Sequence, residues 1–175
     1  MNEALERLAG LIEAVPDFPE PGILFRDITP LLAAPEGLGL TTELLAARVE
    51  AVRPDGIVAI ESRGFIFAAP VCAQLRIPLL LARKPGKLPR TVHEVRYDLE
   101  YGSDAVQMHA DDLRRGGTYL LLDDLIATGG TARATVELVR AAGADVALAL
   151  FVIELEGLAG RDALDVPVDA LLAYR

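Results

Sequence analysis

The sequence contains a single cysteine, Cys72, among 175 residues, so no disulfide can form within the chain. It is also poor in basic residues: 17 lysines and arginines stand against 26 aspartates and glutamates, which gives a formal net charge of −9. Nucleic acids and anionic membranes attract proteins with an excess of basic residues, so we expect neither as a partner. Any anionic ligand must therefore meet a local basic patch.

Long apolar runs are missing as well. No run reaches the roughly 18 residues of a membrane-spanning helix, and residues 1–15, MNEALERLAGLIEAV, lack the basic and apolar regions of a secretory signal. Two histidines and one cysteine offer no cluster for zinc. We expect a cytoplasmic protein that folds as one domain, because a chain of this length with 52% hydrophobic residues can fill one substantial core.

Short apolar runs alternate along the chain with segments of helical periodicity. The runs that predict strands are IVAI (57–60), IPLLLAR (77–83), YLLLDD (119–124) and DVALALFVI (145–153). The segments that predict helices are LTTELLAARVEAV (40–52), FIFAAPVCAQL (65–75) and TARATVELVRAAG (131–143), with an earlier helix over Leu5, Leu8, Ile12 and Val15 that stops at Pro16. Strands that are apolar at every position are buried on both faces, so we expect an α/β fold with a central, mostly parallel twisted sheet flanked by helices.

One long segment interrupts this alternation. Residues 84–109, KPGKLPRTVHEVRYDLEYGSDAVQMH, mix polar and apolar residues around prolines and a turn-like YGSD, which predicts a half-exposed β-excursion. Such insertions serve either as active-site lids or only as mobile surface, and the sequence leaves both alternatives open.

The segment YLLLDDLIATGGTARAT (119–135) combines an apolar strand, two acids and a glycine pair between threonines. Ligands of an open parallel sheet bind beyond the carboxyl ends of its strands, where Asp123 and Asp124 are expected. The loop ATGGT (127–131) can offer backbone N–H groups and a helix N-terminus to a phosphate. Carboxylates accept hydrogen bonds, and sugar hydroxyls can donate them. A ribose 5-phosphate therefore suits both the acidic pair and the glycine loop.

The alternative for this segment is structural: a tight glycine turn with an aspartate near a helix N-terminus. The loop lacks the lysine of a P-loop and the spacing GxGxxG, which disfavours nucleotide hydrolysis and dinucleotide binding.

LLLDDLIATGGT resembles the phosphoribosyl-pyrophosphate-binding motif of the type I phosphoribosyltransferases. PDFPEPGILFRDITPLL, ESRGFIFAAP, RKPGKLP and YDLEYG are similar, in order and spacing, to blocks of the adenine phosphoribosyltransferase family, from about residue 16 to residue 161. The resemblance implies the type I phosphoribosyltransferase fold, with an N-terminal hood over residues 16–32 and a flexible lid over residues 84–109. It also implies purine salvage: transfer of the 5-phosphoribosyl group from 5-phosphoribosyl 1-pyrophosphate to adenine, giving AMP and pyrophosphate, by a homodimer that uses Mg²⁺.

The same resemblance assigns residues to each part of the ligands. Ribose and its phosphate are assigned to Asp123, Asp124, Ala127, Thr128, Gly129, Gly130 and Thr131. Pyrophosphate is assigned to Ser62, Arg63, Gly64, Arg83, Lys84 and Lys87, with a cis peptide between Glu61 and Ser62. Adenine is assigned to Leu24, Phe25, Arg26 and Leu155, although Phe25 and Leu155 also suit plain core positions. Glu100, as manager of the adenine N7 proton, and Tyr101, in the lid, are the catalytic candidates.

Charge supports part of this assignment. Five basic residues, against the single acid Glu94, form the local patch that an acidic protein needs for an anionic ligand: Arg83, Lys84, Lys87, Arg90 and Arg96. We expect Mg²⁺ to be held through ligand oxygens and water, without direct protein ligands. His93 and His109 receive no role.

Two rival functions remain open. Transfer to another base, such as xanthine or orotate, shares the Asp-Asp and Gly-Gly loop but not GILFRDITP. A regulator that senses phosphoribosyl pyrophosphate usually adds a DNA-binding segment, for which the chain has neither spare length nor a basic excess.

Overall fold

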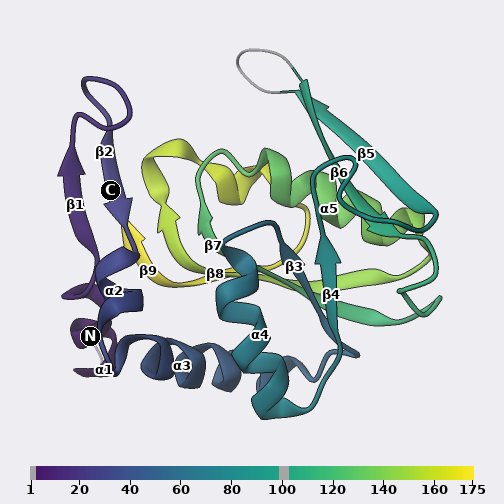
Figure 1. The fold of residues 1–175 in the computed structure, drawn as a ribbon, viewed down its shortest axis with the longest axis horizontal. Helices are drawn as coiled ribbons and strands as arrows, with labels where there is room; N and C mark the ends of the chain where they lie inside the picture. The colour runs from purple at the N-terminus through teal and green to yellow at the C-terminus, as the bar shows by residue number, and fades with distance from the viewer. Residues whose placement is uncertain (1–2, 99–102) are drawn as a thin grey trace. The chain divides into compact units, whose positions relative to one another are not determined.

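The structure is a computed structural model that describes residues 3–98 and 103–175 (Figure 1). Its helices are α1 (Glu3–Ala9), α2 (Thr29–Ala33), α3 (Gly37–Val52), α4 (Gly64–Leu75) and α5 (Gly130–Ala141), with two 3-10 turns, η1 (Glu156–Leu158) and η2 (Gly160–Ala163). Its strands are β1 (Glu13–Pro16), β2 (Leu24–Asp27), β3 (Ile57–Ile60), β4 (Leu79–Ala82), β5 (Val92–Asp98), β6 (Ser103–His109), β7 (Thr118–Ile126), β8 (Asp145–Leu155) and β9 (Val168–Tyr174).

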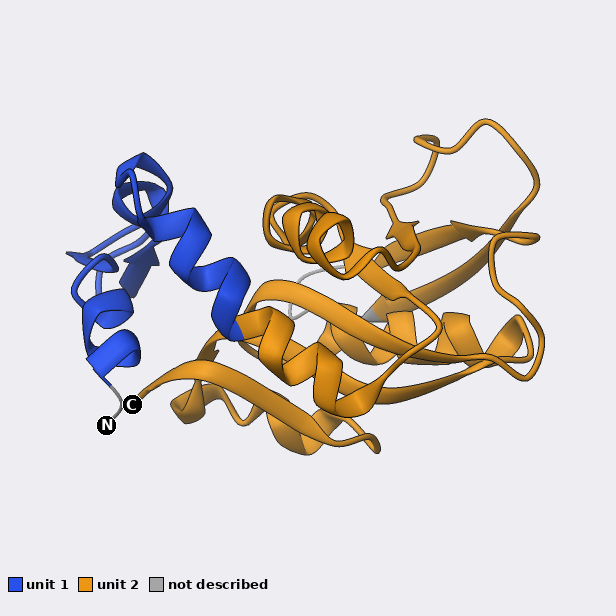
Figure 2. Ribbon diagram, turned by 90° about the horizontal axis from the view of Figure 1, so that it is seen from below, with its two compact units in different colours: residues 1–44 blue, residues 45–175 orange. Residues whose placement is uncertain are grey.

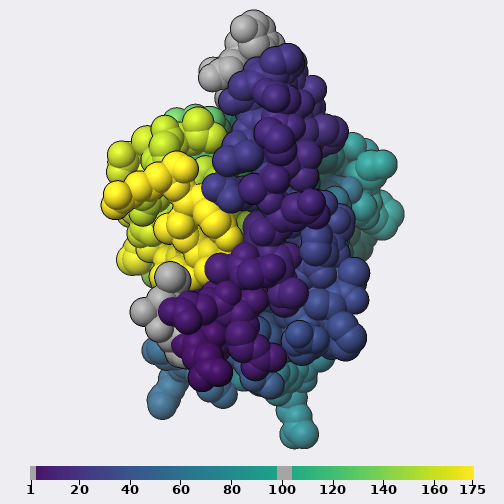
Figure 3. Space-filling model, turned by 90° about the vertical axis from the view of Figure 1, so that its left-hand side faces the viewer, coloured from purple at the N-terminus to yellow at the C-terminus, as the bar shows by residue number. Residues whose placement is uncertain are grey.

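The chain divides into two compact units, residues 1–44 and 45–175, and the division falls inside α3 (Figure 2). The first unit, purple to dark blue in Figure 3, contains α1, α2 and an antiparallel pair of strands, β1 and β2. Between these strands the proline-rich segment turns the chain, and the carboxylate of Asp17 accepts a hydrogen bond from the amide of Gly22 at 2.7 Å.

The first helix is shorter than its periodicity predicts. It ends at Ala9, before Gly10, and the expected last turn instead forms β1, in which Val15 pairs with Phe25. Apolar residues at helical spacing also suit a short strand when a partner strand is present, and Val15 is β-branched. The helix predicted through Val15 was therefore wrong beyond Ala9.

The second unit is built on a five-stranded parallel sheet in the order β4-β3-β7-β8-β9. Residues 57–60 are buried throughout, as expected for a strand covered on both faces. The prediction of an α/β fold with a central parallel sheet is confirmed. The strand β9 fell outside the elements that the sequence predicted.

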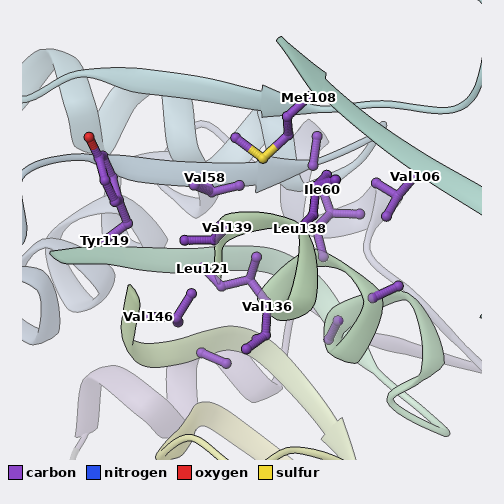
Figure 4. Packing of buried hydrophobic residues seen from close by; sticks show 14 of the residues in the cluster. Val58, Ile60, Val106, Met108, Tyr119, Leu121, Val136, Leu138, Val139 and Val146 are labelled. Carbon is purple, nitrogen blue, oxygen red and sulfur yellow. The ribbon is translucent and has the colours of Figure 1, made fainter. Parts of the chain in front are cut away.

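Alternate residues of the central strands face two different layers. Val58 and Leu121 belong to the apolar cluster that includes Val136 and Val139 of α5 (Figure 4). The other face, which includes the fully buried Leu120, packs against α4. The helix α4 contains Pro70 in its interior, as the sequence predicted. This layering leaves the carboxyl ends of β3 and β7 at one edge, where α4 and α5 begin.

The strands β5 and β6 pair antiparallel, with Tyr97 opposite Asp104, and this pair of strands is called the hairpin below. An isolated bridge between Arg83 and Gln107 joins this hairpin to the chain just after β4. Val106 and Met108 reach from β6 into the apolar cluster (Figure 4). The hairpin is therefore anchored in the core of the second unit.

None of the helices within the described residues is both long and apolar enough to cross a membrane.

Candidate active site

A cleft of about 240 Å³ opens at the carboxyl edge of the sheet. It is lined by Ile60 and Glu61 at the end of β3, by Arg63 and Lys84, by Phe151 of β8, and by residues 123–132. The last segment runs from the end of β7 into the first turn of α5. The cleft thus lies where an open parallel sheet binds its ligands.

The loop between β7 and α5 follows the sequence prediction. Gly129 has a φ of +80° and directly precedes α5, which begins at Gly130. A helix N-terminus presents amide groups that lack intrahelical acceptors, together with the positive end of the helix dipole. Residues 127–131 all line the cleft, so this end of it is suited to a phosphate.

The shape of the loop depends on a backbone contact between two glycines. A Cβ added to Gly129 would lie 2.4 Å from the carbonyl oxygen of Gly160, and a Cβ added to Gly160 would lie 2.2 Å from the carbonyl oxygen of Ala127. No side chain fits at either position without movement of the backbone. The sequence analysis identified Gly129 but missed Gly160, which lies about thirty residues away in the chain.

Gly160 is held by the residue that follows it. The guanidinium of Arg161 donates to both carboxylate oxygens of Glu154, at 3.0 and 2.5 Å, and also to the carbonyl of Val168. Glu154 is buried in β8, where a charge needs a partner. This ion pair fixes η2 to two strands of the sheet, and with it the contact of Gly160 with the loop.

The acidic pair occupies the carboxyl half of β7. Asp124 is buried, and its carboxylate accepts a hydrogen bond from Nε of Arg63 at 2.5 Å. The carboxylate of Asp123 accepts one from the amide of Asp124 at 2.8 Å. Burial, followed by the neighbouring charge of Asp124, raises the pKa of Asp123 well above its ordinary value. A ligand hydroxyl that donates a hydrogen bond to Asp123 would therefore strongly stabilise its ionised form.

Glu61 is a cleft residue that the sequence analysis did not assign. Its carboxylate accepts two hydrogen bonds from Arg83, at 3.2 and 3.1 Å, and one from the amide of Lys84 at 2.9 Å. Burial alone would raise the pKa of Glu61, but these donors outweigh it and lower the pKa. The sequence pattern that could have identified Glu61 is an acid that directly follows an apolar run, as at Asp123. The peptide between Glu61 and Ser62 is cis, as the family resemblance implied.

Lys84 brings its ammonium group to the cleft. It forms an ion pair with Asp104 and donates to the hydroxyl of Tyr97 at 2.8 Å. Burial alone would lower the pKa of Lys84, but these two partners outweigh it and raise the pKa. Lys84 is therefore a charged donor whose position is fixed by the hairpin.

The basic patch is more neutralised than the sequence suggests. Within the described residues, four of its five members form ion pairs: Arg83 with Glu61, Lys84 with Asp104, Arg90 with Asp112 and Arg96 with Glu94. Of the patch, only Lys84 is among the residues that line the cleft within the described chain. The sequence analysis counted only the one acid between Arg83 and Arg96. It did not include acids outside that segment that lie next to these basic residues in the folded chain.

The other predicted residues divide as follows. Arg63 lines the cleft, whereas its neighbours Ser62 and Gly64 and the more distant Arg83 and Lys87 are not among its lining residues in the described chain. Lys87 is exposed, and its carbonyl accepts a hydrogen bond from Arg83 at 3.2 Å.

The candidates for base binding lie in both units. In the first unit, Leu24, Phe25 and Arg26 belong to β2; Leu24 is exposed, and the ring of Phe25 contacts that of Phe18 edge to face at 5.1 Å. In the second unit, Leu155 ends β8 and is half-buried. The catalytic candidates Glu100 and Tyr101 lie outside the described residues.

Within residues 3–98 and 103–175, no group of three or more His, Cys, Asp and Glu side chains could hold a metal ion. The oxygen-rich pair Asp123 and Asp124 offers acceptors for the water shell of a hard cation such as Mg²⁺. His93 and His109 are not among the residues that line the cleft.

Comparison with known proteins decides the family. A family model for the phosphoribosyl transferase domain matches residues 27–172. The chain belongs to the phosphoribosyl transferase domain family. The match includes the cleft and the whole segment between β7 and α5, so the site described above lies in the part of the chain that defines the family.

Similar phosphoribosyl transferases cover nearly the whole chain. An adenine phosphoribosyltransferase of Synechococcus sp. strain CC9902 is 52% identical over 169 residues, which are 95% of this chain and 97% of that protein. The crystal structure of the adenine phosphoribosyltransferase of Thermoanaerobacter pseudethanolicus has a TM-score of 0.93 at 40% identity, covering 97% of this chain and 99% of that one. The enzyme of Saccharomyces cerevisiae, complexed with an imino-altritol bisphosphate and adenine, has a TM-score of 0.94 at 34% identity and covers 98% and 100%.

We predict that Gly160→Ala lowers the affinity for ribose 5-phosphate by about tenfold or more, since the methyl group would displace the carbonyl of Ala127. Isothermal titration calorimetry measures this affinity. Gly157→Ala is the matched control, because a Cβ at Gly157 meets nothing within 4 Å. Equal affinities of the two variants would show that the glycine contact does not shape the phosphate loop.

We also predict that the affinity for ribose 5-phosphate depends on pH through Asp123. A raised pKa keeps this carboxyl protonated to a higher pH than usual, so the ability to accept two hydroxyl donors is lost as pH falls through the raised value. Asp123→Asn removes that titration, whereas the phosphate of the ligand titrates equally in both proteins. The ratio of parent to variant affinity should therefore rise with pH, to roughly tenfold. A constant ratio between pH 4 and pH 9 would contradict this role.

Proposed function

We propose that this chain transfers the 5-phosphoribosyl group from 5-phosphoribosyl 1-pyrophosphate to adenine, giving AMP and pyrophosphate in purine salvage. The observation that carries the proposal is the cleft itself, in which the half-buried Asp123 and the buried Asp124 stand beside a glycine loop at a helix N-terminus. It is supported by the names of the relatives, which are adenine phosphoribosyltransferases, and by the yeast structure that holds adenine.

The two ends of the donor suit two parts of the cleft. The 5-phosphate accepts hydrogen bonds from the amides and hydroxyls of residues 127–131, and the ribose hydroxyls donate to Asp123 and Asp124. The pyrophosphate, at the anomeric carbon, is assigned to Arg63 and Lys84, which supply positive charge from the same cleft. Arg63 pairs with Asp124 in this structure, so it must exchange that carboxylate for the ligand.

The reaction replaces one bond at the anomeric carbon with another. N9 of adenine bonds to that carbon with its lone pair as the bond between the carbon and the pyrophosphate oxygen breaks, and adenine N7 loses its proton. From the family resemblance we assign Glu100 to the proton on adenine N7 and Tyr101 to the closing lid. Stabilisation of the leaving pyrophosphate by fixed charges, and exclusion of water from the ribosyl centre, are the contributions that we expect of the protein.

We infer that Mg²⁺ accompanies the donor. When bound, it offsets negative charge on the pyrophosphate and is coordinated by ligand oxygens and water. Asp123 and Asp124 would orient the ribose hydroxyls and that water shell.

The base assignment rests on the family resemblance and the relatives. From the family resemblance we propose that Leu24, Phe25, Arg26 and Leu155 recognise adenine, with backbone groups of Leu24 and Arg26 assigned to its edge. Phe25 is half-buried in a strand of the first unit, and Leu155 is half-buried at the carboxyl end of β8.

We also propose a cytoplasmic homodimer, since the net charge of −9 disfavours anionic surfaces and the resemblance implies a second subunit.

The test is product formation with a panel of bases. The purified chain is incubated with phosphoribosyl pyrophosphate, Mg²⁺ and, in turn, adenine, hypoxanthine, guanine, xanthine and orotate, and nucleotides are separated by chromatography. We expect AMP from adenine at a rate at least about a hundredfold above any other base, because unpaired polar groups in a base site cost several kcal/mol. Use of another base alone would refute the adenine assignment but keep the transfer. Absence of every nucleotide would refute the transfer as well.

A further inference from the structure

Tyr97 lies directly behind the cleft without being one of its lining residues in the described chain. It belongs to β5, only 4% of its surface is exposed, and its hydroxyl has three polar neighbours. The ammonium of Lys84 donates to it at 2.8 Å and Oγ1 of Thr131 donates at 3.1 Å, while it donates to Oδ2 of Asp104 at 3.2 Å. A phenol has one donor and two acceptor sites, so every site is used.

Two of these neighbours are cleft residues from distant parts of the chain. Thr131 lies in the first turn of α5 and Lys84 follows β4, and both line the cleft. The ring of Tyr97 also supports the loop, since a Cβ added to Gly130 would lie 3.5 Å from it. One buried side chain thus contacts two lining residues of the cleft that come from distant parts of the chain.

A second buried tyrosine shows what a purely structural hydroxyl does in the same unit. Tyr119, at the amino end of β7, is also 4% exposed. Its hydroxyl accepts a hydrogen bond from the backbone amide of Arg114 at 2.9 Å, away from the cleft. Within the described residues, the hydroxyl of Tyr97, in contrast, forms its hydrogen bonds with side chains only, and two of these, from Lys84 and Thr131, line the cleft.

We propose that Tyr97 is a positioning residue for phosphoribosyl pyrophosphate, because its hydroxyl fixes the hydroxyl of Thr131 and the ammonium of Lys84 relative to each other. This inference rests on the proposed function, in which Thr131 serves the 5-phosphate and Lys84 the pyrophosphate. The donor carries its two anionic groups at opposite ends of one ribose. A fixed spacing between their binding groups therefore favours the intact donor over ligands that carry only one of the groups.

The test is Tyr97→Phe, which keeps the ring and removes only the hydroxyl. We expect the KM for phosphoribosyl pyrophosphate to rise roughly 3- to 10-fold, the size of one lost hydrogen bond, with the KM for adenine unchanged. Tyr119→Phe removes the same atom from an equally buried ring, and should lower the thermal stability without changing either KM. An unchanged KM in Tyr97→Phe, or an equal change in Tyr119→Phe, would overturn the proposal.

Calorimetry separates this inference from the proposed function, because it requires no base. We expect Tyr97→Phe to lose more affinity for phosphoribosyl pyrophosphate than for ribose 5-phosphate or for pyrophosphate alone. If the parent binds the donor but makes no AMP, the proposed function fails while this comparison still tests Tyr97. Equal losses for all three ligands would show that Tyr97 does not set the spacing.

A double-mutant cycle identifies the route of the effect. Thr131→Val removes the hydroxyl that Tyr97 contacts, and in its presence Tyr97→Phe should cost clearly less affinity for the donor than in the parent. Fully additive losses would mean that Tyr97 does not act through Thr131, and would overturn this half of the proposal.

Discussion

Two carboxylates stand side by side at the end of β7, where burial and the neighbouring charge of Asp124 oppose the ionisation of Asp123. Asp124 is offset by Arg63, which comes from the start of α4. Among the described residues, Asp123 forms no ion pair and accepts a hydrogen bond only from the amide of Asp124. Burial, followed by the charge of Asp124, raises its pKa. Hydroxyl donors from a ribose would stabilise both charges. The other parts of the cleft serve to hold such a ligand against this pair.

The phosphate loop is positioned for that ligand by contacts that come from outside it. Gly160 packs against the backbone of the loop, and the ion pair of Arg161 with Glu154 holds Gly160 there. On the other side, Tyr97 packs against Gly130 and contacts Thr131. A loop held on two sides has little freedom to lose when it binds, so less of the binding energy is spent on ordering it.

The sequence predicted what local patterns encode. Apolar runs such as residues 57–60 identify the parallel strands, and two acids followed by a glycine pair identify the ligand edge, because each of these signals is contained in one short segment. The helix through Val15 failed because the pairing of Val15 with Phe25 outweighed a short helical periodicity.

The parts of the site that depend on distant segments could not be read in this way. Glu61 forms an ion pair with Arg83, a residue that the sequence analysis had counted in the basic patch for the ligand. Tyr97 lies in a strand whose sequence alternates polar and apolar residues, which gives no sign of a special role. The side chains that it contacts, at positions 84, 104 and 131, come near it only when the chain folds. Charge counts along a segment therefore overestimated the free positive charge at the cleft.

A crystal structure with ribose 5-phosphate tests the central claim most directly. The phosphate oxygens should lie about 2.7–3.2 Å from the amides of residues 127–131. The ribose hydroxyls should contact Asp123 and Asp124, with the guanidinium of Arg63 displaced from Asp124. A phosphate bound elsewhere, or a ribose that leaves both aspartates without a hydroxyl donor, would contradict the account.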